Sequence, residues 1–454
     1  HYWLMDAFNE NSNEQQEQQP MGCLHRFSKT IKVVIIGLLI LLLMIPMFMI
    51  ENLISERGRT QEEAIDEVSE KWSLAQTITG PYLNLQYPVV TENNGEKKVS
   101  IKDLILFPDE LMVNGQLKTE ILKRSIYEVN VYQSELTLKG SFSSEELKKS
   151  RIDMDQLQFD RAAICLNLTD MRGISEQISI TLGDSVYIFE PGMDNRGIAN
   201  TGVHAIANLS ELKQNKKLPY EIKIKLKGSQ SLNFIPLGKT TRVDLKANWN
   251  TPSFTGNYLP NNRNITEKEF SAQWQVLNLN RNYSQVMVDF NTSNIKDIES
   301  SSFGVNFKIP VEQYQQSMRS AKYAILIILL TFGVIFFTEI MNKTRIHALQ
   351  YLLVGLALCL FYSLLLSFSE HVGFNPAYLL SSALTIILVG GYMFGITKKK
   401  KPSLIMSGLL GILYLYIFVL IQLETFALLA GSLGLFIILA MVMYFSKKID
   451  WFNE

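Results

Sequence analysis

The sequence predicts a membrane protein with six transmembrane α-helices, one N-terminal and five C-terminal, and a large all-β, sandwich-like domain inserted between the first and second helices. Three observations lead to this fold class. Long apolar runs are unevenly spaced along the 454 residues, basic residues fall in alternate loops between them, and the long polar segment alternates apolar and polar residues with a period of two.

Each apolar run is long enough to cross the hydrocarbon core of a membrane, because about 20 helical residues span about 30 Å. One run lies alone near the N-terminus, and five follow in the last third of the chain. We therefore expect a tail at 1–32, a transmembrane helix at 33–50, a β-rich domain with an N-terminal stalk helix at 51–320, a five-helix bundle at 321–446 (322–341, 348–368, 377–396, 403–422 and 425–445), and a second tail at 447–454.

Lysine and arginine gather in every second loop. They precede the first run, separate the second from the third, form Lys398–Lys401 between the fourth and fifth, and follow the sixth. The loops at 369–376 and 422–425 contain neither residue. Since cytoplasmic loops carry the excess of basic residues, we expect both termini in the cytoplasm and residues 51–320 on the opposite side of the membrane.

The first 32 residues are expected to form a largely disordered cytoplasmic tail. Residues 9–19 are rich in asparagine, glutamine and glutamate, and such a stretch cannot bury a core. Residues 1–4 have the character of an upstream extension, so Met5 or Met21 is the expected start. The formal net charge of the chain is +0, which argues against nucleic acid as a partner.

The polar segment begins with a helical pattern and then changes to a strand pattern. Residues 60–76 place apolar side chains at three- and four-residue steps, and Gly80-Pro81 is expected to end this stalk helix. From Tyr82 to about Phe307 the period is two, with turn residues between the segments. This predicts antiparallel sheets in one sandwich or a pair of sandwiches, so one large core and two smaller cores both remain open.

The chain has no recognisable set of catalytic residues. His204 is the single histidine of the β domain and has no Cys or His at metal-ligand spacing. On this topology Cys23, Cys165 and Cys359 lie in three different compartments, so we expect no disulfide. No nucleophile elbow is present. We therefore expect a protein that is not an enzyme, with no catalytic residue, cofactor or metal.

A loop rich in proline and asparagine carries the aromatic residues Trp249, Phe254 and Tyr258. Aromatic loops on a rigid β domain often bind ligands, which makes these residues candidates for a binding surface. Aromatic side chains in a β domain are more often part of the core, so core packing is the favoured alternative.

Ionisable residues near the ends of the apolar runs form the second group of candidates. Glu339 lies near the end of the second run, and Glu370 and His371 follow the third. A carboxylate beside an imidazole can shift the pKa of either group, so Glu370-His371 is the best candidate in the bundle. The favoured alternative is an interfacial structural pair. Small residues four positions apart also predict close helix packing at Gly391/Gly395, Ser407/Gly411 and Ala430/Gly434.

Several longer motifs occur in a fixed order along the chain. The polar segment has Ile78-Thr-Gly-Pro81, Pro108-Asp-Glu-Leu-Met-Val113 and Asp170-Met-Arg-Gly173, and the bundle has Ser320-Ala-Lys-Tyr-Ala-Ile-Leu326, Arg345-Ile-His347 and Leu366-Ser-Phe-Ser-Glu-His-Val-Gly-Phe374. From about Thr30 to Trp451 the sequence resembles the CreD family of bacterial inner-membrane, cell envelope integrity proteins. The resemblance implies a role in envelope integrity and stress response, and it brings no catalytic residue or cofactor.

We therefore expect a non-enzymatic protein of the bacterial inner membrane that supports cell envelope integrity. Its periplasmic β domain would bind an envelope component or a protein partner, while lipids surround the bundle. The alternative is a transporter or lipid-handling protein that uses the five-helix bundle and has a polar cavity near Glu370 and His371. The oligomeric state is left open.

Overall fold

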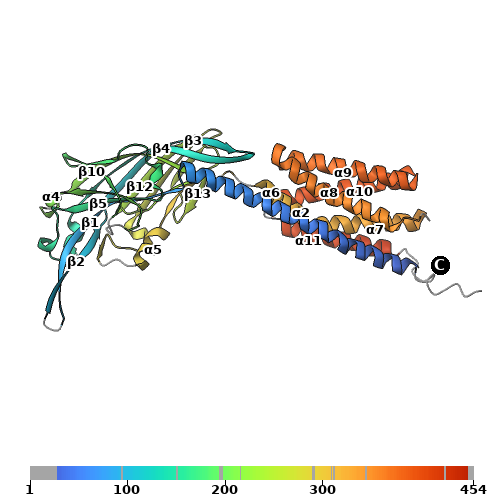
Figure 1. Ribbon diagram of the computed structural model, residues 1–454, viewed down its shortest axis with the longest axis horizontal. Helices are drawn as coiled ribbons and strands as arrows, with labels where there is room; N and C mark the ends of the chain where they lie inside the picture. The colour runs from blue at the N-terminus through green and yellow to red at the C-terminus, as the bar shows by residue number, and fades with distance from the viewer. Residues whose placement is uncertain are drawn as a thin grey trace, which may run out of the picture. The chain divides into compact units, whose positions relative to one another are not determined.

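The computed structural model describes residues 28–93, 96–149, 152–193, 198–214, 216–288, 292–307, 309, 312–342, 345–423 and 426–447. The chain forms two compact units, His1–Gly58 with Val311–Glu454, and Arg59–Pro310. The first unit is helical, and the second contains both β-sheets (Figure 1).

The helical unit combines one N-terminal helix with helices from the C-terminal third of the chain. Within the described residues, α2 and α7 to α10 are long and apolar enough to cross a membrane. The described apolar stretch of α11 covers only Leu429–Met441, so the sixth transmembrane span stays a prediction. The bounds are α2 Ser28–Trp72, α6 Glu312–Lys322, α7 Ala324–Asn342, α8 Ala348–Val372, α9 Phe374–Thr397, α10 Lys400–Gln422 and α11 Ala427–Ser446.

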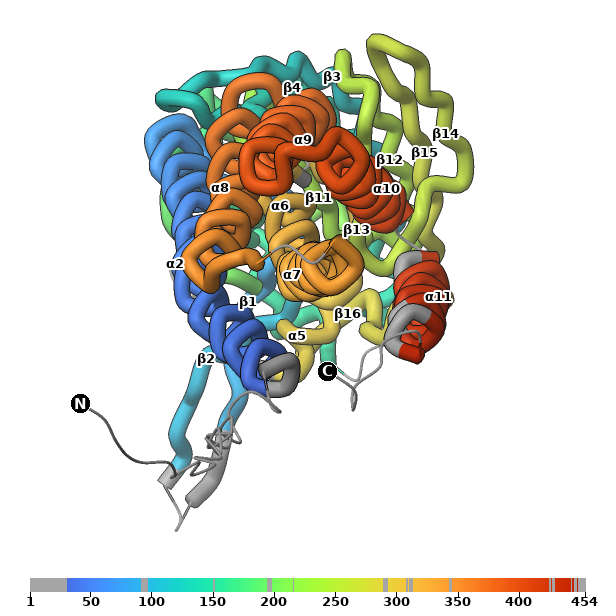
Figure 2. Tube along the Cα trace, turned by 90° about the vertical axis from the view of Figure 1, so that its right-hand side faces the viewer, coloured from blue at the N-terminus to red at the C-terminus, as the bar shows by residue number. Residues whose placement is uncertain are grey.

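The bundle is built on contacts between consecutive helices. α8 packs against α9, α9 packs against α10, and α7 contacts both α8 and α10. Figure 2 shows these helices nearly end-on, with α11 at the edge of the group. Gly355 of α8 leaves a space that the Leu43 side chain of α2 fills, because a Cβ atom at Gly355 would collide with Leu43. A glycine thus lets the N-terminal helix approach the bundle closely.

α2 is one continuous helix of 45 residues, in place of the expected span at 33–50 and separate stalk helix at 60–76. Pro46 lies inside it and removes one backbone hydrogen bond without ending it. Residues 51–59 contain no second proline, and Gly58 alone disfavours the helix by only about 1 kcal/mol. Gly80-Pro81 does not end the helix either, since it lies inside strand β1 with a cis peptide bond.

The second unit contains a nine-stranded and an eight-stranded sheet. In the nine-stranded sheet the order is β13-β17-β11-β1-β5-β9-β8, with β2 paired to β1 and β16. Its strands are β1 Gln76–Asn93, β2 Glu96–Leu106, β5 Ala162–Leu168, β8 Glu190–Pro191, β9 Gly202–Ala207, β11 Ser231–Phe234, β13 Ser253–Gly256, β16 Val286–Val288 and β17 Phe303–Asn306.

The eight-stranded sheet has the order β14-β15-β12-β3-β4-β10-β6-β7. Its strands are β3 Glu110–Arg124, β4 Tyr127–Phe142, β6 Ser179–Leu182, β7 Ser185–Ile188, β10 Leu218–Ser229, β12 Thr240–Ala247, β14 Asn262–Ile265 and β15 Phe270–Leu277. The short helices of this unit are α3 Glu145–Lys149, α4 Ser210–Lys213 and α5 Thr292–Ser300, with 3-10 turns η1 Met154–Gln156, η2 Met171–Gly173 and η3 Asn278–Asn280.

Both sheets are mixed, which corrects the expectation of purely antiparallel sheets. β1 pairs with β11 in parallel, and β3 pairs with β12 in parallel, while the other strand pairs are antiparallel. Each parallel pair joins strands that are far apart in the sequence. The alternation of side chains shows which faces are buried but not which strand lies beside which, so the sequence could not reveal these pairings.

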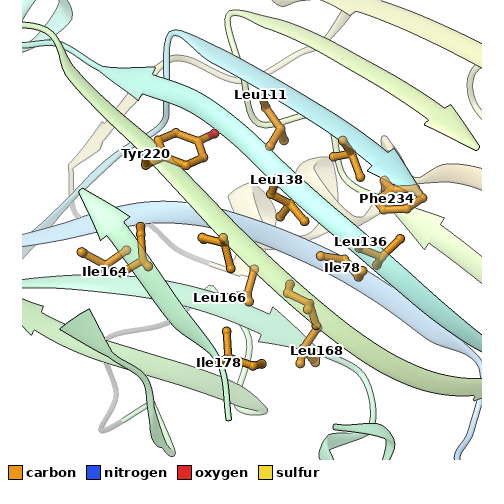
Figure 3. Close-up of a cluster of buried hydrophobic side chains, with 14 of the residues drawn as sticks. Ile78, Leu111, Leu136, Leu138, Ile164, Leu166, Leu168, Ile178, Tyr220 and Phe234 are labelled. Carbon is orange, nitrogen blue, oxygen red and sulfur yellow. The ribbon is translucent and has the colours of Figure 1, made fainter. Parts of the chain in front are cut away.

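One large hydrophobic core fills the space between the two sheets. Leu111, Leu138 and Tyr220 come from the eight-stranded sheet, and Ile78 and Ile164 from the nine-stranded sheet (Figure 3). A smaller cluster that includes Tyr82, Phe107 and Leu237 forms a second group. Of the two arrangements that the sequence left open, the structure has one main core with a satellite cluster.

Leu138→Ala should destabilise the β domain by about 2–5 kcal/mol, because the Leu138 side chain is fully buried and its removal leaves a cavity. The unfolding midpoint, followed by tryptophan fluorescence in detergent-solubilised full-length protein, should fall by roughly 5–15 °C. The matched control is Thr137→Ala, the neighbouring half-buried residue, which should shift the midpoint little. Equal shifts for the two variants would contradict the assigned core.

Candidate functional site

Glu339, near the end of α7, is the centre of a buried polar cluster that joins three parts of the helical unit. Its carboxylate forms an ion pair with Lys32 of α2 and accepts hydrogen bonds from Ile346 N (3.2 Å) and Tyr351 Oη of α8 (3.1 Å). Lys32 Nζ also donates to the carbonyl oxygen of Ile346 at 3.1 Å. Both carboxylate oxygens therefore have partners.

The Glu339 cluster holds the beginning of α2 against the turn between α7 and α8. The Glu339 side chain is only 11% exposed, and a buried carboxylate without partners would cost several kcal/mol. The sequence indicated Glu339 as a candidate but gave no sign of its partners, because Lys32 lies 307 positions away. In the sequence, Lys32 is simply one of the basic residues that precede the first apolar run.

Glu370, near the end of α8, forms a second polar cluster within the helical unit. Its Oε1 atom accepts a hydrogen bond from Tyr314 Oη of α6 at 2.9 Å and lies 3.8 Å from Arg57 Nε of α2. Arg57 is 48% exposed, so this ion pair is screened by solvent and is weaker than the Glu339 cluster. The sequence gave no sign of Arg57 or Tyr314 as partners.

The two clusters contact the same helix at two points one membrane thickness apart. Lys32 and Arg57 are separated by 25 positions of α2, or about 38 Å at 1.5 Å per residue. A bilayer with its headgroups is about 40–45 Å thick. The spacing therefore matches charges at the two membrane interfaces, where hydration and pairing both stabilise them.

His371 does not join Glu370 in a pair. The His371 side chain is exposed, and the described residues show no hydrogen bond or ion pair between the two side chains. Consecutive side chains on a helix point about 100° apart. Because the Glu370 side chain faces α6, the side chain of the next residue, His371, points away from α6. Glu370 is therefore held by Tyr314 and Arg57, whereas the His371 side chain is exposed and does not contact Glu370.

The three aromatic candidates of the β domain are all half-buried and pack against the main core. The Phe254 ring packs edge-on against Phe270 (5.9 Å between centroids) and Trp274 (5.7 Å), as core packing predicts. Trp249 is half-buried, and its Nε1 donates to Thr251 O at 3.0 Å. Tyr258 is half-buried too, but it lines a hollow of about 940 Å³ on the surface of the domain.

The close helix contacts in the bundle differ in part from the predicted pairs of small residues. Tyr416 of α10 donates to Ala430 O of α11 at 2.7 Å, and its ring occupies the space that a side chain at Gly434 would need. Gly391, Gly395 and Gly411 have open space instead. α9 and α10 are in close contact at Gly390, where a Cβ atom would collide with Ser407 and whose carbonyl accepts from Ser403 Oγ at 2.6 Å.

A third polar cluster, inside the β unit, holds the C-terminal end of α2. The buried Asp170 accepts hydrogen bonds from Leu74 N (2.9 Å), Ser73 Oγ (3.3 Å) and Arg172 Nε (3.0 Å). Gln76 Nε2 donates to Asp170 O at 2.7 Å. Burial raises the pKa of Asp170, but the bonds from Arg172 and from the Leu74 and Arg172 amides outweigh it, so the pKa lies below its ordinary value.

In each of these clusters a carboxylate is paired with a lysine or an arginine. Within the described parts of the chain, no group of three or more His, Cys, Asp and Glu side chains could hold a metal ion. Cys165 and Cys359 are buried free thiols, one in each unit. Each cluster fixes α2 to its surroundings, and none presents a nucleophile next to a base.

Long apolar helices combined with a large inserted β domain define a multi-span membrane protein. The family profile described as "Inner membrane protein CreD" matches residues 28–452. The Escherichia coli (strain K12) protein with the same description is 32% identical over 420 residues, which cover 91% of this chain and 91% of that protein. The chain therefore belongs to the CreD family of inner membrane proteins.

Glu339→Gln and Lys32→Met should each destabilise the helical unit, and the double variant should recover part of the loss. We expect a coupling free energy of about 0.5–3 kcal/mol, because the two groups form one buried network. Thermal unfolding of the four proteins in detergent measures it. The control cycle uses the exposed pair Lys123–Glu128, for which the coupling should stay below about 1 kcal/mol. Additive effects of Lys32→Met and Glu339→Gln would contradict the cluster.

Asp170→Asn should make the free energy of unfolding of the β domain depend less on pH in the acidic range. Because the folded pKa of Asp170 is lowered, its charge stabilises the fold above the ordinary Asp pKa of about 3.9, and this contribution is lost as the pH falls through the folded pKa. Urea unfolding at a series of pH values between 7 and 3, followed by tryptophan fluorescence, measures this. An unchanged slope for Asp170→Asn would show that Asp170 contributes nothing to acid sensitivity.

Proposed function

We propose that this CreD family protein is a non-enzymatic component of the inner membrane that supports cell envelope integrity, with its β domain in the periplasm as the binding part. The observation that carries the proposal is α2, a single helix that begins in the membrane unit and ends in the β domain. Such a helix links the large β domain to the membrane unit covalently. An envelope component or a protein partner would be the ligand.

The orientation rests on the distribution of basic residues. Lys32 lies at one end of α2, and Lys399 Nζ is 3.5 Å from Asn342 Oδ1 at the end of α7, three residues after Glu339. The loop between α9 and α10 is therefore at the same end of the bundle as the Lys32–Glu339 pair. By the positive-inside rule this end is cytoplasmic, and both termini with it.

We also propose that the protein is not an enzyme, because the carboxylates that could act as acids or bases already have partners within the protein. The carboxylates of Glu339, Glu370 and Asp170 are each held by neighbouring side chains or backbone amides. A catalytic acid or base would need access to substrate. In the described residues these carboxylates instead attach α2 to its surroundings.

Lipid handling by the bundle is the second candidate, and one observation favours it over transport of a polar substrate. An apolar hollow of about 360 Å³ lies between α7, α10 and α11, lined by residues that include Gly333, Ile412 and Gly434. By contrast, the interior between α8, α9 and α10 is filled by aromatic rings. Phe361 lies 4.5 Å from Tyr414 and 5.4 Å from Tyr378 between ring centroids.

The test is rescue of envelope tolerance in a bacterium whose own CreD family gene has been deleted. The full-length chain should restore growth on detergent or a wall-active antibiotic, whereas a chain lacking residues 76–307 should not. A C-terminal tag confirms equal amounts of both proteins in the membrane fraction. Full rescue by the shortened chain would contradict the role of the β domain. Loss of rescue in Gly333→Phe, which fills the apolar hollow, would favour lipid handling instead.

A further inference from the structure

The outward face of the eight-stranded sheet has a trough that crosses β14, β15, β12 and β3. Two adjoining hollows form it, of about 940 Å³ and about 590 Å³, and they share Asp244, Asn262 and Gln273. The sheet is covered by the main core only on its other face, because β12 and β15 alternate buried and open side chains. The trough is therefore open to solvent over its whole length.

Amide side chains dominate the lining of the trough. They account for six of the twelve residues that line the larger hollow and five of the eleven that line the smaller one. A side-chain amide offers two N–H donors and an oxygen acceptor on one planar group. Such groups suit a ligand that presents donors and acceptors side by side.

The strand register places these side chains in rows across the sheet. One row runs Asn262, Gln273, Asp244, Asn114, and the next runs Asn264, Ser271, Lys246, Gln116. Neighbouring strands lie about 4.8 Å apart, so a row offers a polar group about every 5 Å. An extended polymer laid across the strands would meet a polar side chain at each step.

The polar groups of the trough are only partly paired within the protein. Among the described residues, the side chains of Asn114, Gln116 and Gln275 have no hydrogen-bond partner, whereas Asn262 Nδ2 donates to Gln273 Oε1 at 3.4 Å. On β4 and β10 the charged residues pair with each other, as Lys139 does with Glu221 at 3.2 Å. The unpaired amides of the trough are available to a ligand.

Tyr258 forms one wall of the larger hollow and is held in place before any ligand binds. Its hydroxyl donates to Asn280 O at 2.8 Å, its ring packs edge-on against Phe303 (5.8 Å), and its carbonyl accepts from Trp274 Nε1 at 3.2 Å. A fixed aromatic ring beside amide groups offers an apolar face to the C–H side of a sugar ring. Preorganisation of this kind lowers the entropy lost on binding.

The trough carries a small positive charge, since Arg242, Lys246 and Arg263 line it together with the single carboxylate Asp244. A lining of this kind favours a ligand with few negative charges over a polycation. Amide groups that recur across the strands, an aromatic wall and a small positive charge together fit a hydroxyl- and amide-bearing polymer. We propose that the trough binds the N-acetylated glycan strand of the cell wall. This inference rests on the proposed periplasmic location of the β domain.

The test measures binding of glycan strands freed of their stem peptides to full-length protein in nanodiscs, by thermophoresis. Saturable binding is expected, and the triple variant Asn114→Ala, Asn262→Ala, Gln273→Ala should weaken it at least about tenfold. The matched control Gln177→Ala removes an exposed amide just before β6, at the far side of the same sheet, and should change the affinity less than twofold. Unfolding followed by tryptophan fluorescence checks that each variant is folded.

Two outcomes would overturn the inference. One is equal affinity of the triple variant and the unaltered protein for glycan strands. The other is preference for a polyanionic glycan without N-acetyl groups, or for the stem peptide alone. The rescue experiment separates this inference from the proposed function: absence of glycan binding in a protein that restores envelope tolerance overturns only the ligand, whereas failure of the full-length chain to restore tolerance overturns the proposed function itself.

Discussion

The continuity of α2 is the constraint on which the rest of the structure depends. This helix is the first apolar segment of the membrane unit, and its residues from Arg59 to Trp72 are the first element of the β unit. Pro46 and Gly58 are the two positions at which the helix would be expected to fail. Polar clusters outside these weak points hold the helix, around Lys32 at one end and Asp170 at the other.

The polar clusters have different strengths because their surroundings differ. Glu339 is buried and surrounded by a lysine, a tyrosine and a backbone amide, so loss of one partner leaves a charge or a donor without compensation. The pair of Arg57 with Glu370 is open to solvent on the arginine side and depends more on the Tyr314 hydroxyl.

Local sequence patterns predict many of the helices and strands, whereas contacts between residues far apart in the sequence could not be predicted. The apolar runs of α7 to α10 and the alternation in β10 are local, so the sequence alone indicated the helices and the buried face of the strand. The parallel pair of β3 with β12 and the ion pair of Glu339 with Lys32 join residues more than a hundred positions apart. The rows of exposed amides could not be recognised in the sequence either, because only the register of β12, β15 and β3 brings these side chains together.

The most direct test of the account is the distance between spin labels at Leu41 and Glu62, two exposed positions of α2 that flank both Pro46 and Gly58. The labelled protein, with its native cysteines replaced, is placed in nanodiscs and measured by pulsed electron paramagnetic resonance. A continuous helix predicts one narrow distribution near about 32 Å, from 21 residues at 1.5 Å each. A broad distribution, or a major population well below that distance, would show that α2 bends or breaks between the two units and would contradict the account.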